Sequence, residues 1–329
     1  KRKPNQFLLT GSIRFTLKKE IREALTGRIL LYELLPFTLA ESLHLRPSLF
    51  LQGCFENLFS TGTKKDDQGE HWLQKIEKNH ASRGINFKHV GRYLTLGGMP
   101  IPCFSRNPLN RKLWYESFFE TLITRDLTLV DESLADVGVP RGLSFLRGLA
   151  FMQGRELNSS SLAHGAALSL DKAKKIINAL VALCLIDLVV PETRAHKSQK
   201  KVQVEWKDVG LWNYFCQASA EGLRDQTTPM NLILSQEFRF QLGLLERPTA
   251  WTYYKSHNGA AVPWIFRQGD HALALTYLPF EAPTHYQYRA LKQFVQDNPK
   301  SVGIILGPEK AMFTALDDRV ILMPFTVAL

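Results

Sequence analysis

The chain has 329 residues, enough for two or three domains, and 45% of them are hydrophobic, which is typical of a globular protein with buried cores. Its formal net charge of +10 makes nucleic acid or another polyanion a reasonable partner, although the basic residues are spread along the sequence. No apolar run approaches the roughly 18 to 20 residues that cross a membrane, and the four cysteines lack metal-ligand spacing. These features predict a cytoplasmic protein with no membrane partner.

The first forty residues predict a strand, a helix and a second strand. An apolar run ends in Thr10-Gly11-Ser12, a basic amphipathic segment follows as far as Gly27-Arg28, and a second apolar run reaches Phe37. A parallel β-α-β unit needs neighbouring strands, so we expect residue 1 to lie in the middle of a domain whose earlier strands have been lost or were never present.

Helical patterns dominate the next hundred residues. Thr38 is a good cap for a short helix, and residues 51–59 and 71–80 are helical in pattern around a polar loop. The sequence Gly97-Gly98-Met99-Pro100 then leads to one long predicted helix with Trp114, Phe118, Phe119 and Leu122 on an apolar face. In this helix we expect Arg125 and Asp126 to form a structural pair.

Residues 141–206 predict three helices followed by two strands around a basic loop, which is the order of a winged helix-turn-helix. The third helix, from about residue 169 to 185, would be the recognition helix. Its lysines and those of the wing are the candidates for nucleic-acid binding: Lys172, Lys174, Lys175, Arg194, Lys197, Lys200 and Lys201. The alternative is a docking domain whose lysines are simply solvated.

The last hundred residues predict a mixed α/β arrangement. A helix at 231–244 precedes three strands at 251–255, 262–267 and 273–278, a helix at 286–296, and strands at 302–306 and 320–323.

Three of these stretches resemble a family of prokaryotic, archaeal-type AAA+ ATPases that carry a C-terminal domain of restriction-endonuclease-like fold. The resemblance rests on Leu9-Thr10-Gly11-Ser12, on Gly97-Gly98-Met99-Pro100, and on Trp114-Tyr115-Glu116-Ser117-Phe118. It implies a polar nucleotide sensor at Thr10 and Ser12 and a candidate arginine finger at Arg28. The alternative for Arg28 is a solvated cation at a helix end.

The resemblance also implies a domain division. Residues 1–46 would be the C-terminal half of the nucleotide-binding core and 47–140 a helical lid. Residues 141–208 would be the winged helix, and 209–329 a domain with the endonuclease-like fold.

The endonuclease motifs of that family are degenerate here. Metal-dependent cleavage of a phosphodiester needs paired carboxylates and a lysine. The corresponding positions hold Ala261, Pro263, Thr276 and Leu278, and the preceding helix offers Ser235 or Glu237. We therefore expect no metal site and no nuclease activity.

The chain also lacks a phosphate-binding loop of the form G-x-x-x-x-G-K-[S/T]. No cofactor is expected in this chain, and ATP with Mg²⁺ is implied only for the family. Three hypotheses follow: a non-catalytic ATPase-family protein that acts by binding protein or nucleic acid, a DNA-binding winged helix, or the C-terminal part of an active ATPase whose core is completed by another subunit or polypeptide.

Overall fold

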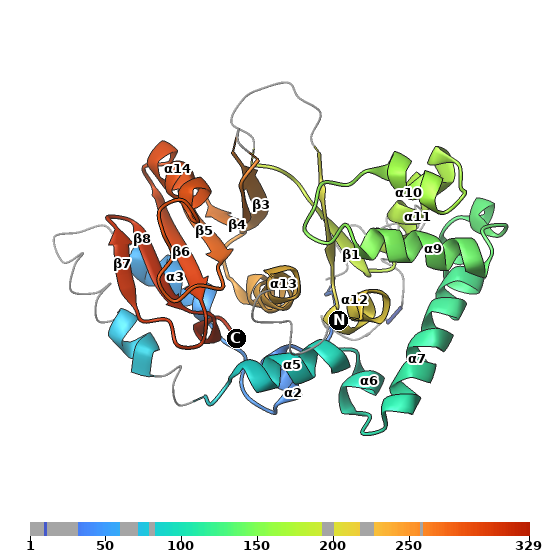
Figure 1. Ribbon diagram of the computed structural model, residues 1–329, viewed down its shortest axis with the longest axis horizontal. Coiled ribbons are helices and arrows are strands. Elements are labelled where there is room, and N and C mark those ends of the chain that lie inside the picture. Colours follow the sequence, from blue (N-terminus) through green and yellow to red (C-terminus); the bar gives the residue numbers. More distant parts are fainter. Residues whose placement is uncertain are drawn as a thin grey trace, which may run out of the picture.

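The computed structural model describes residues 10–11, 32–59, 72–78, 83–192, 201–217, 227–256 and 259–329. Figure 1 shows a β-sheet on one side, a group of helices on the other, and the long helix α13 (Thr227–Leu244) between them. The fold is mixed α/β, as the sequence predicts. One continuous apolar core includes Leu180 from the helices, Phe238 from α13 and Leu275 from the sheet, so the two sides are packed together.

The sheet has six strands in the order β3-β4-β5-β6-β8-β7. Neighbouring strands are antiparallel from β3 to β5, parallel from β5 through β6 to β8, and antiparallel again at the β7 edge. The sequence patterns predict five of these strands and miss only the short edge strand β7. The bounds are β3 (Ala250–Lys255), β4 (Ala261–Gln268), β5 (His271–Tyr277), β6 (Ser301–Gly307), β7 (Thr314–Asp317) and β8 (Val320–Pro324).

The two faces of the sheet are covered by different helices. Trp264 and Phe266 of β4 meet Phe238 of α13, with ring centroids 5.2 and 5.4 Å apart. On the other face, Ile265 of β4 shares a second apolar cluster with Phe294 of α14 (Arg289–Asp297). Since α14 joins β5 to β6, it lets these two strands run parallel.

The helical side begins with α2 (Leu39–Ser42), for which Thr38 and Glu41 form a capping box, as the sequence predicts for Thr38. The elements that follow before the strand pair are α3 (Phe50–Leu58), α5 (Phe87–Leu96), α6 (Pro100–Phe104), α7 (Pro108–Thr121), η2 (Leu122–Asp126), α8 (Leu127–Val130), η3 (Glu132–Leu134), α9 (Val139–Ala150), α10 (Ser159–Gly165) and α11 (Leu170–Ala182). None of the helices in the described part of the chain has both the length and the apolar character needed to cross a membrane.

The sequence predicts one uninterrupted α-helix after Gly97-Gly98, and this prediction is wrong. The segment is α7, then a π-helical turn at η2, then α8. Phe119 and Leu122 are buried, whereas Trp114 and Phe118 are only half-buried and stack on each other at 5.1 Å. The wider π turn changes the register of the helix face, which simple 3.6-residue periodicity cannot anticipate.

The strand pair β1 (Ile186–Val189) and β2 (Gln203–Trp206) follows the three helices α9, α10 and α11 in the predicted order and is antiparallel. Gln153 and Glu156, between α9 and α10, form isolated bridges with β2. Helix α12 (Val209–Cys216) comes next and packs against α5 and α9 as well as α13.

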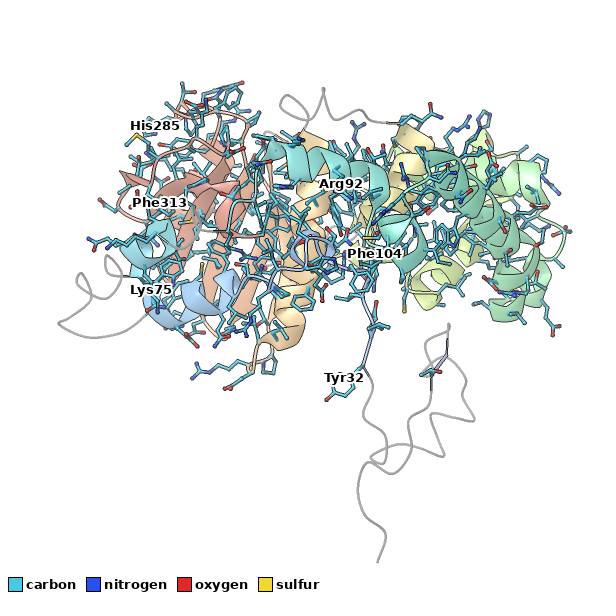
Figure 2. The ribbon with its side chains drawn as sticks, turned by 90° about the horizontal axis from the view of Figure 1, so that it is seen from below. Tyr32, Lys75, Arg92, Phe104, His285 and Phe313 are labelled. Atoms are coloured by element: carbon cyan, nitrogen blue, oxygen red, sulfur yellow. The ribbon has the colours of Figure 1, made fainter. Side chains whose placement is uncertain are left out.

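The predicted strand that ends at Phe37 is not present in its described part. Residues 32–38 have no regular structure; Tyr32 is 87% exposed and Leu34 98%. Pro36 has no N–H to donate to a neighbouring strand. The next residue, Phe37, donates its backbone N–H to Gly98 O at 2.8 Å. Figure 2 shows Tyr32 standing away from the body of the molecule. Apart from Thr10 and Gly11, the rest of the predicted strand-helix-strand unit lies outside the described residues.

We expect the substitution Gly98→Ala to lower the free energy of unfolding by at least about 2 kcal/mol. A methyl group at this position would overlap the Phe37 carbonyl oxygen and lie 2.7 Å from Gln236 Nε2. Chemical denaturation would measure the change. The matched control is Gly243→Ala in the last turn of α13, where the methyl meets no atom within 4 Å and helix propensity favours alanine. A loss at Gly98 no larger than that at Gly243 would contradict the prediction.

Candidate functional site

Asp208 is a buried carboxylate at the meeting point of three chain segments. It caps α12 by accepting a hydrogen bond from Leu211 N at 2.8 Å, and it accepts a second from Gly98 N at 2.6 Å. Gly97, whose φ is +68°, ends α5 and allows this approach; a side chain on it would strike Asp208 and Gly210. Burial raises the pKa of Asp208, while its backbone hydrogen bonds lower it. The Gly97-Gly98 motif therefore has a structural explanation at this junction.

Glu237 on α13 is the second buried carboxylate at the same junction. Its Oε1 accepts a hydrogen bond from Leu39 N at 2.5 Å, and its Oε2 has no hydrogen-bond partner among the described residues. Burial raises its pKa to about 8, although the Leu39 N–H and the charge of Arg83 act in the opposite direction. The neighbouring Gln236 donates to Phe37 O at 3.2 Å, and Tyr93 donates its hydroxyl to the same oxygen. Residues 37–39 are thus held by α5 and α13 together.

The degenerate endonuclease positions do not converge on a single site. Ser235 of α13 accepts a hydrogen bond from Trp264 Nε1 at 2.9 Å on the α13 face of the sheet. Leu278 packs with the cluster around α14 on the opposite face, and strand alternation places Thr276 on that side too. Ala261 is exposed at the start of β4. The structure gives these residues packing roles.

Pro263 lies where β4 is irregular. The pairing with β3 shifts register here, because Thr252 pairs with Ile265 whereas Tyr254 pairs with Val262. Proline cannot donate to a sheet ladder and is tolerated at such bulges. Glu237 points away from this strand toward Leu39, so it does not replace the missing acid.

Two of the three candidate lysines of α11 form ion pairs with nearby aspartates. Lys172 forms an ion pair with Asp136, and Lys175 pairs with Asp171 at 3.2 Å and donates to Ser133 Oγ at 2.9 Å. Lys174 is exposed, with no ion-pair partner among the described residues. Lys201 lies 3.7 Å from Glu156. The remaining wing candidates, Arg194, Lys197 and Lys200, lie outside the described residues.

The sensor-like residues are not brought to any site in the described part of the chain. Thr10 is exposed, and both Ser12 and Arg28 lie outside the described residues.

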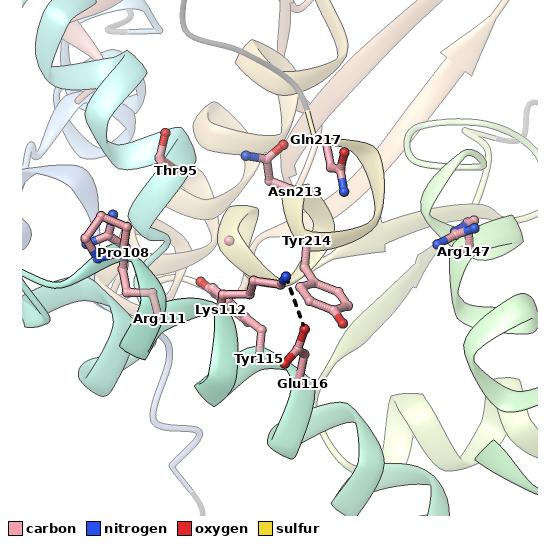
Figure 3. A pocket seen from close by; sticks show the side chains of 11 residues that line it. Thr95, Pro108, Arg111, Lys112, Tyr115, Glu116, Arg147, Asn213, Tyr214 and Gln217 are labelled. Atoms are coloured by element: carbon pink, nitrogen blue, oxygen red, sulfur yellow. Dashed lines mark ion pairs between the residues drawn. The ribbon is translucent and has the colours of Figure 1, made fainter. Parts of the chain in front are cut away.

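A pocket of about 450 Å³ opens between α5, α7, α9 and α12. Figure 3 shows Arg111 and Arg147 on opposite sides of it, with Lys112, Glu116 and Tyr214 between them. The residues that line it are Thr95, Pro108, Arg111, Lys112, Tyr115, Glu116, Arg147, Gly210, Asn213, Tyr214 and Gln217.

The walls of this pocket are fixed by buried hydrogen bonds. Tyr115 is buried and donates its hydroxyl to Leu96 O at 2.9 Å, while Asn213 donates to Leu94 O at 3.1 Å. Gly210 lets α12 approach α7, because a side chain there would overlap the Tyr115 hydroxyl. Burial, the largest cause, and the Glu116 carboxylate raise the pKa of Tyr214, so this phenol stays neutral.

Three cations and one carboxylate line the pocket. Arg111 donates to Ser105 O at 2.8 Å, Lys112 lies 3.8 Å from Glu116, and Arg147 has no ion-pair partner among the described residues. The sequence analysis singles out none of the three cations, because they come together only when α7 and α9 pack around the pocket. Within the described residues, no group of three or more His, Cys, Asp or Glu side chains could hold a metal ion.

Comparison with known families gives two matches. Residues 1–43 match a family described as an AAA domain, and residues 87–222 match a domain of unknown function (DUF8612). Every residue that lines the pocket lies within the second match. No curated protein and no solved structure matches the chain. The first match ends within α2, so it includes the segment held by Gly98 and Glu237.

We expect stability to fall as the pH rises from about 4.5 to about 8, and Glu237→Gln to remove a large part of this fall. In this window the unfolded state loses the proton of Glu237, whose ordinary pKa is 4.5, while the folded state keeps it up to about pH 8. The proton therefore stabilises the folded state below this range. Above this range the folded state has lost at most roughly 5 kcal/mol of stability.

Urea unfolding at several pH values would measure this effect. Glu205, whose pKa burial raises to about 7, contributes in the same direction, so some pH dependence should remain in the variant. Glu246→Gln, at an exposed position just after α13, is the matched control and should leave the profile unchanged. A variant at Glu237 with the same pH profile as the parent would contradict the assignment.

Proposed function

We propose that this chain is a non-catalytic, partner-binding protein of the AAA ATPase family. In it a winged helix and an endonuclease-like domain serve as recognition scaffolds. The match of residues 1–43 to an AAA domain supports the family assignment. Hydrogen bonds from residues 37–39 to Gly98 and Glu237 attach that part of the chain to the end of α5 and to α13.

The order of elements supports an endonuclease-like domain. A helix, three antiparallel strands, a second helix and a strand parallel to the third follow one another as α13, β3, β4, β5, α14 and β6. Likewise, α9, α10, α11, β1 and β2, with the bridges of Gln153 and Glu156 to β2, support a winged helix.

The observation that carries the non-catalytic assignment is the packing at the expected active centre. A hard cation needs carboxylate oxygens. The corresponding positions instead contain Pro263 at a bulge, Leu278 in an apolar cluster, and Ser235 bonded to Trp264.

We predict that the purified chain cleaves neither single-stranded nor duplex DNA in Mg²⁺ or Mn²⁺. Adding either ion should also leave the thermal unfolding midpoint unchanged, because no carboxylate cluster binds it. Gel assays and thermal scans with and without EDTA would measure both. Cleavage that EDTA abolishes would overturn the non-catalytic assignment.

A protein partner is favoured over duplex DNA because of the charges around α11. Duplex affinity comes mainly from cations that are free to neutralise phosphates. Two of the three α11 lysines already face Asp136 and Asp171. Exposed Lys174 and the basic loop before β2 are the features that favour duplex binding as the second candidate.

We predict that duplex binding is weak at physiological salt and that Lys174→Gln changes it by no more than about twofold. Fluorescence anisotropy across a salt series would measure the affinity. Lys300→Gln, which removes an exposed cation from the far side of the sheet, is the matched control. Tight, salt-dependent binding that Lys174→Gln weakens severalfold, with no effect of Lys300→Gln, would instead establish the DNA-binding role.

A further inference from the structure

We propose that the pocket between α5, α7, α9 and α12 binds an extended acidic peptide from a partner protein, with Arg111 and Arg147 holding carboxylates at its two sides. This inference rests on the partner-binding role proposed above and names the surface and the chemistry of the partner. The pocket volume of about 450 Å³ lies within the range of ligand-binding pockets, roughly 300 to 1,000 Å³.

The first step is the charge of the lining. The lining contains three cations, Arg111, Lys112 and Arg147, and one carboxylate, Glu116, so its net positive charge favours an anionic ligand. A guanidinium binds a carboxylate through two parallel hydrogen bonds. Arg147 has no competing ion pair in the described part of the chain, and Arg111 uses only one of its donors, on Ser105 O. Both are available to a ligand.

The second step is the separation of the cations. Arg111 projects from α7 and Arg147 from α9, and Figure 3 shows them at opposite sides of the pocket. A ligand that satisfies both must carry negative groups at two places along its length. Gln217, just after α12, also lines the pocket, and its side-chain amide can bond to a peptide backbone.

The third step distinguishes a peptide from a nucleic acid. Glu116 lies between Arg111 and Arg147 in Figure 3 and only accepts hydrogen bonds, so a ligand with a hydrogen-bond donor at this point is favoured. A peptide backbone supplies N–H groups between acidic side chains, whereas a phosphodiester chain places further negative charge there. The exposed pair Lys112–Glu116, 3.8 Å apart, is weak enough to exchange for contacts with the ligand.

The experiment uses the full chain and a fluorescein-labelled octapeptide of alternating aspartate and glycine, titrated at low salt by fluorescence anisotropy. We expect saturable binding that weakens at least about tenfold in the double variant Arg111→Gln with Arg147→Gln. The asparagine version of the peptide should bind at least about tenfold more weakly, and so should the version in which sarcosine replaces glycine and removes backbone N–H groups.

Lys310→Gln, which removes an exposed cation before β7, is the control and should leave the affinity within about twofold of the parent. Arg147→Gln alone serves if the double variant unfolds. The inference is overturned if the peptide does not bind, if Lys310→Gln weakens it equally, or if a single-stranded oligonucleotide of the same charge binds more tightly. Failure here would leave the predicted absence of DNA cleavage untouched, so the two proposals are tested separately.

Discussion

The arrangement of the whole molecule depends on the buried polar side chains of α13. Four of them bond to distant parts of the chain: Gln236 to Phe37 O, Glu237 to Leu39 N, Arg239 to Asp187 at 2.8 Å, and Gln241 to both Leu51 N and Ala328 O. Leaving such a group buried without a partner costs about 1–3 kcal/mol. These contacts therefore fix where the amino-terminal segment, the strand pair and the carboxyl terminus lie relative to the sheet.

This constraint gives a structural explanation for two of the motifs on which the resemblance to the ATPase family rests. Gly97 and Gly98 leave room for Asp208 and Phe37 to approach their backbone. Tyr115 of the aromatic motif donates a hydrogen bond to Leu96 O. Both motifs build the junction and the rear wall of the pocket. They are explained by packing, whereas the groups open to a ligand are the pocket cations, which come from α7 and α9.

The sequence patterns predict elements well and their assembly poorly. Alternation and apolar runs locate five of the six sheet strands, and caps such as Thr38 and Ser169 mark helix starts. The patterns fail where tertiary contacts decide. They predict a strand at Phe37 because the run is apolar, and a continuous helix through the π turn. The residues that line the pocket are spread between positions 95 and 217, so they come together only after four helices have packed.

The partners of α13 are spread from residue 37 to residue 328, and this has a consequence for folding kinetics. A helix whose polar groups are satisfied only by distant segments gains little from forming early, because closing such long loops costs chain entropy before the contacts compensate for it. Helix α11, whose lysines pair with Asp171 in its own helix and with Asp136, 36 residues away, faces a much smaller cost. The helical side is therefore suited to form first, and α13 to be completed last, when the carboxyl terminus reaches Gln241.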